Sequence, residues 1–391
     1  MHEGLSLSMN RGVARQNEAR CTLVAVGDVS LGDHPVCAGT GLRWKFEATT
    51  GGASSYPFEH LGEVIQDRPD AMFCNLETVA VPWKYNRERL DAAQMCAHPL
   101  GLERLRTAGF TAVNVANNHI LQHGDSAFWF TVGELNRSGA AVIGLGEGGE
   151  RAQIVVQELS GVRVAWLGYA FEEDKYWNGR PLYAYGPAID VVRDIDRARA
   201  VADVVVVSAH WGDEFVDCPS PQERVLARRW IESGATVVIG HHPHVIRGYE
   251  RWGPGVIFYS LGNFVFDMVW DERLRIGLFA SLTLSRQRVE DVKIGFARIG
   301  DDYQPRALAP GRAVEASRRL TLLNERLSQE MRMDLYQAAV RRAIRRNRYR
   351  SWRYFLRQSR QRPLTLTCQQ LYGAIQRRVE TGLASRPGEP R

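Results

Sequence analysis

Carboxylate, amide and imidazole side chains recur in short clusters along roughly the first 270 positions of this chain. The clusters are Gly27-Asp28, Asn75-Leu76-Glu77, Asn117-Asn118-His119, His210-Trp211-Gly212, Gly240-His241-His242-Pro243-His244 and Asn263. Carboxylates supply charge, imidazoles bind borderline metals such as Zn, Mn or Fe, and an amide offers a neutral oxygen. A pair of such ions lowers the pKa of a bridging water. The residue types therefore indicate a divalent-metal site for hydrolytic chemistry.

Each cluster contributes side chains with a candidate role at this site. The predicted metal ligands are Asp28, Glu77, Asn118, His210, His242 and His244. His242 and His244 give the sharpest signal, because alternation along a strand would place both rings on one side. His119, beside Asn118 in the candidate catalytic group, would act as a general acid or as a clamp for an oxyanion. Taken singly, each cluster also has a plain structural interpretation as a turn, a helix entry or a buried core residue.

Short apolar, β-branched runs precede these clusters and predict the elements that position them. The runs are 22–26, 71–74, 111–115, 141–143, 162–167, 204–207, 236–239 and 255–259, with helical spacing between them at 99–108, 126–138 and 220–233. Strands that alternate with helices predict a buried, largely parallel sheet. Ligands of open α/β sheets bind beyond the carboxyl ends of the strands, where the clusters lie.

Other segments predict features around that sheet. Residues 276–300 switch to a period of two, which predicts a terminal antiparallel hairpin. Segment 82–97, rich in Arg, Tyr and Trp, and the aromatic segment 171–185 are expected to be loops over the sheet edge that carry substrate determinants. The sequence Ser220-Pro221-Gln222-Glu223 is typical of a helix start.

Charge divides the chain into two unlike parts. Residues 312–391 contain 19 arginines, no lysine and 6 acidic residues, a net charge of +13, so that residues 1–311 carry −7 of the total of +6. The boundary falls near Pro310-Gly311. We expect a loosely held segment at 1–20, one α/β domain at 21–311 and an Arg-rich helical extension at 312–391, with two helices between 313 and 360 and a frayed end from Ala384.

The basic extension allows three interpretations. Its arginines form the solvated face of a helical cap, or they attract a polyanion such as polyglutamate or nucleic acid, or they attract an anionic membrane surface. Residues 1–20 lack the apolar core of a signal peptide, and no stretch reaches about 18 uncharged apolar residues. We therefore expect a cytoplasmic protein without a transmembrane segment, peripheral to the inner membrane face at most. Six cysteines without a C-x-x-C pair argue against a zinc ribbon.

The clusters resemble, in order and spacing, those of the CapA family of poly-γ-glutamate capsule proteins, a branch of the calcineurin-like metallophosphoesterase superfamily. The matching pieces run from Val26-Gly27-Asp28 to Ser260-Leu261-Gly262-Asn263-Phe264 and cover about residues 21 to 267. The resemblance implies a sandwich of two β-sheets flanked by helices, with a two-metal centre. It assigns the six predicted ligands to the metals and makes His119 the group that protonates a leaving group. The residues expected to support the ligands from behind are Asn75, Asn117, His241 and Asn263.

One position departs from the superfamily pattern. The wider superfamily begins with Asp-x-His, whereas Ser30 stands two residues after Asp28. This departure implies that one ion is weakly held, or that Asp33 or His34 takes the place of the missing ligand.

Fold and family leave three functions open, because one metal scaffold serves amides and phosphate esters alike. The first is a metal-dependent hydrolase acting on poly-γ-glutamate or a related γ-glutamyl compound, linked to capsule biosynthesis. The second is a phosphoesterase, and the third is a non-catalytic subunit that holds an anionic chain. The cofactors implied for the first two are two divalent metal ions.

Overall fold

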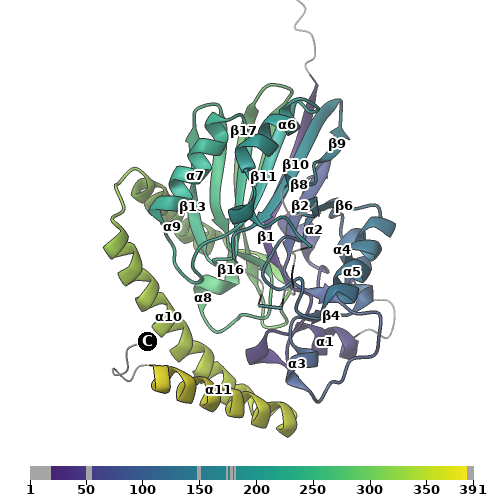
Figure 1. Cartoon of the computed structure of the whole chain (residues 1–391), viewed down its shortest axis with the longest axis vertical. Coiled ribbons are helices and arrows are strands. Elements are labelled where there is room, and N and C mark those ends of the chain that lie inside the picture. The colour runs from purple at the N-terminus through teal and green to yellow at the C-terminus, as the bar shows by residue number, and fades with distance from the viewer. Residues whose placement is uncertain are drawn as a thin grey trace, which may run out of the picture.

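The computed structural model describes residues 19–49, 55–147, 151–172, 175–176, 179 and 182–384. Residues 1–18 of the segment predicted to be loosely held, and the predicted frayed end beyond Ala384, lie outside these residues. Within them the chain forms two β-sheets packed face to face, with helices on both outer faces (Figure 1). The sandwich of two sheets flanked by helices is thereby confirmed.

The first sheet contains eight strands among the described residues. In spatial order they are β18 (Pro305–Ala307), β17 (Val289–Ile299), β16 (Ile276–Ser285), β1 (Arg20–Val29), β2 (Ala71–Leu76), β5 (Ala112–Asn114) and β6 (Ala141–Ile143), with β15 (Asn263–Val265) beside the end of β1. Strands β1, β2, β5 and β6 run parallel. The hairpin predicted at 276–300 is confirmed as β16 and β17, and β16 pairs antiparallel with β1.

The second sheet contains six strands among the described residues. Their spatial order is β13 (Ile246–Trp252), β14 (Gly255–Leu261), β12 (Val237–His241), β11 (Val204–His210), β10 (Val162–Ala170) and β9 (Val155–Leu159). The four inner strands are parallel, and both edge strands are antiparallel to their neighbours. The predicted buried, parallel arrangement holds for the inner strands, but these strands divide between two sheets, because alternation of strands and helices does not reveal which sheet a strand joins.

Apolar side chains fill the space between the two sheets. Phe73 of β2 and Trp166 of β10 stack across it with ring centroids 5.2 Å apart. Both faces of the inner strands are covered, which explains why β2 and β11 are buried at every residue. The two sheets are thus held together mainly by burial of apolar area.

Helices cover the two outer faces of the sandwich (Figure 1). Helices α4 (Pro99–Thr107) and α5 (Asp125–Arg137) pack on the first sheet, and α6 (Val191–Arg199) and α7 (Pro221–Glu232) pack on the second. The predicted helices at 99–108, 126–138 and 220–233 are confirmed within two residues at either end, whereas α6 was not predicted. Helix α7 begins with a capping box, in which Ser220 Oγ accepts from Glu223 N at 3.1 Å and Glu223 Oε2 accepts from Ser220 N at 2.6 Å.

Shorter elements lie in the connections. They are η1 (Pro35–Cys37), α1 (Leu42–Thr49), α2 (Leu61–Val64), β3 (Val79–Ala80), α3 (Leu90–Ala93), β4 (Cys96–Ala97), β7 (Gly146–Glu147), β8 (Arg151–Ala152), η2 (Gly186–Ala188) and α8 (Glu272–Arg275). The segment 82–97, predicted as a loop, therefore contains a helical turn and a short strand that pairs with β3.

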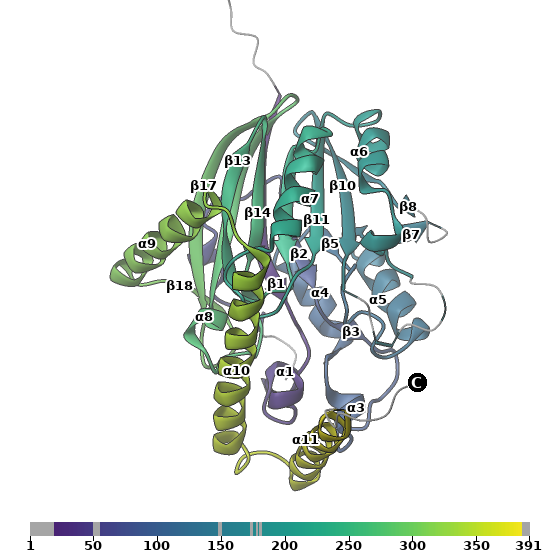
Figure 2. The same cartoon turned by 60° about the vertical axis from the view of Figure 1, so that its left-hand side comes forward.

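The C-terminal extension is helical, as predicted, and packs against the sandwich (Figure 2). It consists of α9 (Pro310–Leu327), α10 (Met333–Gln358) and an additional helix, α11 (Leu364–Ala384). Helix α9 lies on β13, where Asn324 Oδ1 accepts from Tyr249 N at 2.9 Å. Helix α11 lies beside α3, where Gln369 Oε1 accepts from Leu90 N at 2.8 Å.

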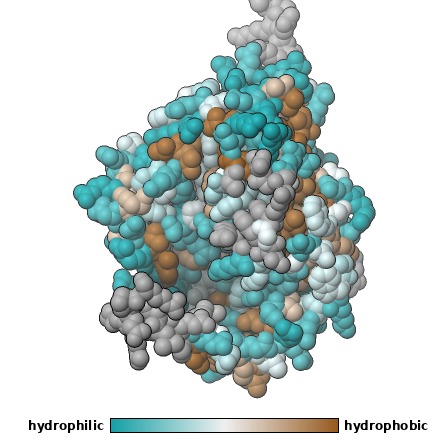
Figure 3. All heavy atoms as spheres, viewed as in Figure 1, coloured by the Kyte–Doolittle hydropathy of each residue, from teal (hydrophilic) through white to brown (hydrophobic). Residues whose placement is uncertain are grey.

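The surface in the view of Figure 3 is largely hydrophilic, with hydrophobic residues in small separate groups. Among the residues that the structure describes, no helix combines the length and the apolar character needed to cross a membrane.

Candidate metal centre

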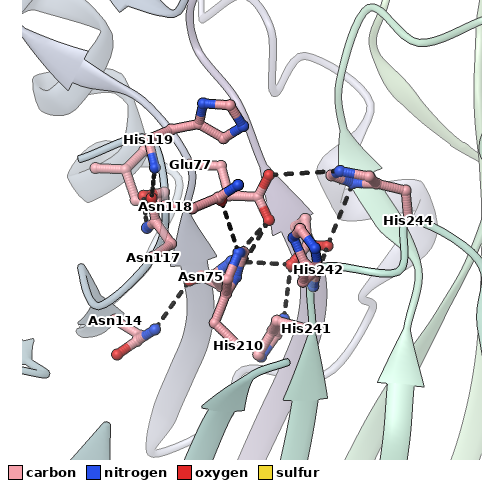
Figure 4. A network of polar contacts seen from close by, with 12 residues as sticks. Asn75, Glu77, Asn114, Asn117, Asn118, His119, His210, His241, His242 and His244 are labelled. Atoms are coloured by element: carbon pink, nitrogen blue, oxygen red, sulfur yellow. Dashed lines mark hydrogen bonds and ion pairs between the residues drawn. The ribbon is translucent and has the colours of Figure 1, made fainter. Parts of the chain in front are cut away.

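The predicted polar clusters meet because they follow strands that end on the same side of the sandwich. Asp28 pairs in register with Asn75 of β2 and with Asn263 of β15, and His210 pairs with His241 of β12. At Gly27 a Cβ atom would lie 1.9 Å from the carbonyl oxygen of Gly262, so only glycine allows these two segments to approach so closely. Parallel strands from both sheets thereby bring residues more than 200 positions apart into one network (Figure 4).

Asn75 lies at the middle of this network. Its Nδ2 lies 3.0 Å from Asp28 Oδ1, 3.1 Å from Glu77 Oε1 and 3.2 Å from His210 Nδ1. Its Oδ1 accepts from Asn114 Nδ2 at 2.9 Å. Both ends of the amide are engaged, so Asn75 orients its neighbours. Asn114 was not predicted, although an amide inside the apolar run 111–115 was a signal for it.

Asp28 is fully buried and held as a carboxylate. Oδ1 lies 2.8 Å from His241 Nδ1, and Oδ2 accepts from the backbone N–H of His242 at 3.2 Å. Burial by itself would raise the pKa of Asp28, but the hydrogen bond from His241 and the charges of His241 and His244 bring it below its ordinary value. His241 therefore contacts Asp28 through Nδ1, and its Nε2 has no hydrogen-bond partner among the described residues.

Glu77 is also fully buried, but its carboxylate is only partly compensated. Oε1 meets Asn75 and lies 3.4 Å from His210 Nδ1, whereas Oε2 has no hydrogen-bond partner in the described part of the chain. Burial, followed by the negative charge of Asp28, raises the pKa of Glu77 well above its ordinary value. Buried polar atoms are almost always paired, so the orphaned oxygen indicates a place for a cation.

Two adjoining groups of donor atoms could hold metal ions. In one, ligand atoms of Asp28, Glu77 and His244 lie within 4.8 Å of one another, and in the other those of Glu214, His242 and His244 do so. His242 Nδ1 is a further buried atom without a hydrogen-bond partner among the described residues. Carboxylates with imidazoles suit Zn, Mn or Fe, so the donor set fits one or two neighbouring ions.

His244 connects the two donor groups. Its Nδ1 lies 2.9 Å from Asn263 Oδ1, and its Nε2 lies 3.8 Å from Glu77 Oε2 and 4.0 Å from Glu214 Oε1. Such a contact behind a ring fixes the nitrogen that faces a metal. Glu214, 40% exposed, was not predicted as a ligand. Its position four residues after His210, in the same polar segment, was the available signal.

His210 and Asn118 were predicted as ligands and lie beside the two donor groups without belonging to either. His210 Nε2 lies 3.0 Å from Asn118 Oδ1, and the ring centroid of His210 lies 4.6 Å from that of His242. Burial, and then the charges of neighbouring histidines, lower the pKa values of His210 and His242 well below the ordinary value. Both rings are therefore neutral, the state in which an imidazole binds a metal.

The backbone around His242 and His244 differs from the expectation. Both residues lie in the turn after β12 with positive φ angles of 92° and 58°, so strand alternation does not bring their rings together. Residues other than glycine rarely adopt this conformation, and those that do are concentrated at functional sites. The ring centroids are 6.0 Å apart.

His119 lies at the more exposed edge of the cluster. Asn117 holds its backbone by accepting from His119 N at 3.1 Å while donating to the carbonyl oxygen of Leu76 at 2.7 Å. Burial lowers the pKa of His119 to about 4, and its Nδ1 lies 3.2 Å from Gln122 Oε1. The ring is thus neutral, and its Nε2 has no hydrogen-bond partner among the described residues. The exposed Lys175, in the predicted loop 171–185, adds a positive charge nearby.

The segment after Asp28 supplies no obvious replacement for the missing histidine. Ser30 Oγ lies 3.4 Å from the carbonyl oxygen of Gly32. The Asp33 carboxylate accepts from the backbone N–H groups of Gly39, Arg43 and Trp44 at 2.8 to 3.2 Å, which places it at the start of α1 rather than at the metal centre. His34 Nδ1 accepts from Val36 N at 3.1 Å. The expected substitution by Asp33 was therefore wrong.

The fold and the site define the class of protein: a two-sheet α/β sandwich flanked by helices, with a buried set of carboxylates, amides and imidazoles at its strand ends. Residues 22–268 match the model of the family described as bacterial capsule synthesis protein PGA_cap, and the chain belongs to this family. The resemblance found in the sequence is thereby confirmed.

Curated relatives carry names from the same field. The chain is similar to the capsule biosynthesis protein CapA of Bacillus anthracis, with 32% identity over 66% of this chain and 62% of the relative. It is similar to the PGA biosynthesis protein CapA of Bacillus subtilis, with 37% identity over 42% of this chain and 45% of the relative. A Mycobacterium tuberculosis protein named probable polyglutamine synthesis accessory protein is 29% identical over 51% of this chain and 56% of the relative. The chain thus spans less than two thirds of each relative's length.

A solved structure described as a novel phosphatase from Mycoplasma pneumoniae is also similar. It shares 12% identity, has a TM-score of 0.41, and the comparison covers 71% of this chain and 94% of that one. This likeness is too distant to carry an argument.

Proposed function

We propose that this chain is a metal-dependent hydrolase that cleaves γ-glutamyl amide bonds of poly-γ-glutamate or a related γ-glutamyl compound in capsule biosynthesis. The observation that carries the proposal is the pair of adjoining donor groups, in which Glu77 Oε2 and His242 Nδ1 are buried without a hydrogen-bond partner among the described residues. Membership of the capsule synthesis family and the names of the relatives support the substrate class.

In this proposal the residues of the site have different roles. Ions bound by Asp28, Glu77, His242 and His244, with Glu214, His210 and Asn118 beside them, would supply Lewis acidity and a water of lowered pKa. Asn75, His241 and Asn263 hold the ligands in place through the contacts described above. His119 Nε2, at the exposed edge, exchanges a proton with the substrate. Lys175, whose charge reaches His119, attracts a free carboxylate of a γ-glutamyl substrate.

A non-catalytic accessory subunit is the second candidate. Ser30 lacks a metal-binding side chain where the superfamily has histidine, and one relative is named an accessory protein. A subunit of this kind would use the same cluster to hold an anionic chain. The third candidate, a phosphoesterase, would use the same donor groups on a phosphate ester.

Metal content and turnover of the purified full chain test the proposal. We expect close to two equivalents of Mn, Zn or Fe by elemental analysis, lost in His242→Ala with His244→Ala. The matched control, His60→Ala with His98→Ala, changes two histidines outside the cluster and should keep the metal. The same preparations are assayed on a γ-glutamyl anilide, on poly-γ-glutamate and on a nitrophenyl phosphodiester.

Each outcome of these assays separates the candidates. Cleavage of γ-glutamyl bonds that disappears with the metal supports the hydrolase. Cleavage of the phosphodiester alone favours the phosphoesterase, and protein that neither contains nor takes up metal favours the accessory subunit. Full turnover by metal-stripped protein would overturn the proposed chemistry.

A further inference from the structure

A groove of about 670 Å³ lies between the C-terminal half of α10 and the body of the sandwich. Its charged lining among the described residues consists of Lys45, Arg275, Arg350, Arg353 and Arg357 against one acid, Asp301. Most of the lining belongs to residues beyond 268, outside the segment that matches the family model. The groove is therefore a feature that the C-terminal extension adds to the family fold.

Three of the five cations are already engaged by the protein. Lys45 Nζ donates to the carbonyl oxygen of Asp301 at 2.6 Å, Arg275 pairs with the Asp301 carboxylate at 2.5 Å, and Arg350 pairs with Asp271 at 2.7 Å. These contacts hold the walls of the groove in place and leave the net charge positive.

Arg353 and Arg357 remain available to a ligand. Among the described residues, Arg353 makes one hydrogen bond, which it donates to the hydroxyl of Tyr349 at 3.0 Å, and Arg357 makes no hydrogen bond or ion pair. Both are exposed, and their spacing of four residues places the two guanidinium groups on one face of α10. Two like charges at this spacing oppose each other, and an anion bound between them would relieve that repulsion.

The groove lies close to the metal centre. The ring of Trp270, which lines the groove, packs against the ring of His34 with centroids 5.0 Å apart. His34 N also donates to the Asp267 carboxylate at 3.0 Å, and the ring of Phe266, the residue before Asp267, packs against the ring of His244 with centroids 5.1 Å apart. A short series of contacts through Trp270, His34 and Phe266 therefore links the groove to the metal centre.

The aromatic residues of the groove are engaged with other groups. Tyr303 lies under Lys45 at 4.2 Å, Tyr349 lies under Arg353 at 5.5 Å, and Trp270 packs between His34 and Tyr354. Proteins that bind single-stranded nucleic acid usually offer free ring faces on which bases stack. The lining instead offers guanidinium forks, which match carboxylates in pairs of hydrogen bonds.

We propose that this groove binds a segment of a carboxylate polymer, the γ-linked polyglutamate chain, and so guides the chain to the neighbouring metal centre. The inference rests on the proposed function for the identity of the polymer. It adds a second binding site, formed by Arg353 and Arg357 of α10, that holds substrate residues remote from the bond being cleaved.

Binding of a fluorescein-labelled γ-linked glutamate decamer to the full chain tests this proposal. Fluorescence anisotropy is measured at 50 and 200 mM NaCl for the native chain and for Arg353→Gln with Arg357→Gln. We expect the variant to bind at least about tenfold more weakly and to depend less on salt, because two charge-assisted contacts are lost. The matched control, Arg341→Gln with Arg342→Gln, removes the same charge from α10 outside the groove and should change the affinity less than about twofold.

Turnover separates this inference from the proposed function. The groove variant should keep its rate on a γ-glutamyl anilide, which is too short to reach the groove, and show a raised KM for the polymer. The variant His242→Ala with His244→Ala should bind the decamer as the native chain does. If no substrate is cleaved by any preparation, the proposed function fails, while loss of decamer binding in the groove variant alone still supports the groove.

Three results would overturn the inference. If the groove variant and the control bound the decamer equally weakly, the loss of affinity would be due to net charge alone. Tighter groove-dependent binding of a deoxythymidine decamer than of the glutamate decamer would assign the groove to nucleic acid. Groove-dependent binding to vesicles with anionic lipid, without binding of the decamer, would assign it to a membrane surface.

Discussion

The metal centre and the groove under α10 both gather charged side chains, but they differ in burial. Asp28 and Glu77 are fully buried, and each contacts partners that hold it in place. Arg353 and Arg357 are exposed and largely free of partners among the described residues. The first region can polarise a bond, because charges interact strongly where water is excluded, whereas the second can attract a chain from solution.

This difference predicts how each region responds to mutation. Removing one partner from a buried set leaves an uncompensated group, which costs several kcal/mol, whereas exposed pairs contribute from about 0 to 1 kcal/mol. Buried charges should therefore control folding and metal binding, and exposed charges should control association and its dependence on salt.

The largest effect on stability is expected at Arg247, a fully buried arginine next to the metal centre. It donates to the carbonyl oxygens of Asp213 at 2.6 Å and Val216 at 2.8 Å and pairs with Glu223, and so holds the segment that carries Glu214. Arg247→Met should lower the free energy of unfolding in urea by about 3 to 5 kcal/mol, because Glu223 is left buried and unpaired.

A double variant checks the cause of that loss. Arg247→Met with Glu223→Gln removes the stranded charge while keeping an acceptor for Ser220, so it should regain part of the stability. If Arg247→Met alone lowered the free energy of unfolding by less than about 1 kcal/mol, burial would not explain the difference between the two regions.

A smaller effect, on metal affinity, is expected at Asn263. The Oδ1 atom of Asn263 contacts Nδ1 of His244 and so holds the His244 ring. Asn263→Ala should weaken metal affinity by about 10- to 100-fold, because the His244 ring is no longer fixed. Competition with a chelator measures the affinity. Asn263→Asp keeps an acceptor at this position and should lose less, and unchanged affinity in Asn263→Ala would remove Asn263 from the support of the site.

A buried acid pair, Asp33 and Asp267, gives a pH test of the same principle. A Cβ atom on Gly41 would lie 2.3 Å from Asp267 Oδ2 and 2.5 Å from Asp33 Oδ1, so the two carboxyl groups are close together. Burial raises the pKa of Asp33 to about 6, and burial with the charge of Asp33 raises the pKa of Asp267 well above its ordinary value. Raised values mean that the pair stabilises the fold at low pH, and that this contribution is lost as the pH rises through 6 and beyond.

Asp267→Asn should flatten this dependence. Between pH 5 and pH 8 the free energy of unfolding in urea should fall on the order of 2 kcal/mol less in the variant than in the native chain. Asp67→Asn, which changes an exposed acid, is the control and should follow the native curve. Parallel curves for Asp267→Asn and the native chain would show that the pKa of Asp267 is not raised in the folded protein.

The smallest effect is expected at Arg332, which pairs with Asp334 at 3.0 Å on the surface, where the two side chains are 73% and 61% exposed. Arg332→Ala should change the free energy of unfolding by less than about 0.5 kcal/mol, because water screens the pair. Arg247→Met and Arg332→Ala both remove the arginine of an ion pair with an acid, but the first pair is buried and the second is exposed. A loss near that of Arg247→Met would contradict the comparison.

Much of the scaffold could be predicted because it depends on neighbouring residues. The apolar runs marked most of the inner strands, the capping box at Ser220 marked the start of α7, and the period of two marked the hairpin of β16 and β17. Strand ends then indicated where the polar clusters meet. The helix α6 and the edge strands β9 and β13 were missed, since their patterns mix polar and apolar residues.

The sequence predicted which types of residue form the site, but not which of these residues contact one another. The structure places Glu214 and Asn114 in the site, although neither was predicted from the sequence. It places Asp33, a predicted substitute ligand, at the start of α1. Which polar residue meets which partner depends on how two sheets stack, and spacing along one chain does not contain that information.

The sequence by itself determined most of the inner strands, the helices α4, α5 and α7, the family, the clusters at the strand ends and a basic helical extension, because side-chain periodicity and helix caps depend on residues close together in the chain. Only the tertiary structure decided that Glu214 joins His244, and that α10 lies against Lys45 and Trp270 to form a positive groove. Such contacts join residues far apart in the chain, and they follow from the packing of whole surfaces, in which each apolar face is buried against the surface that fits it.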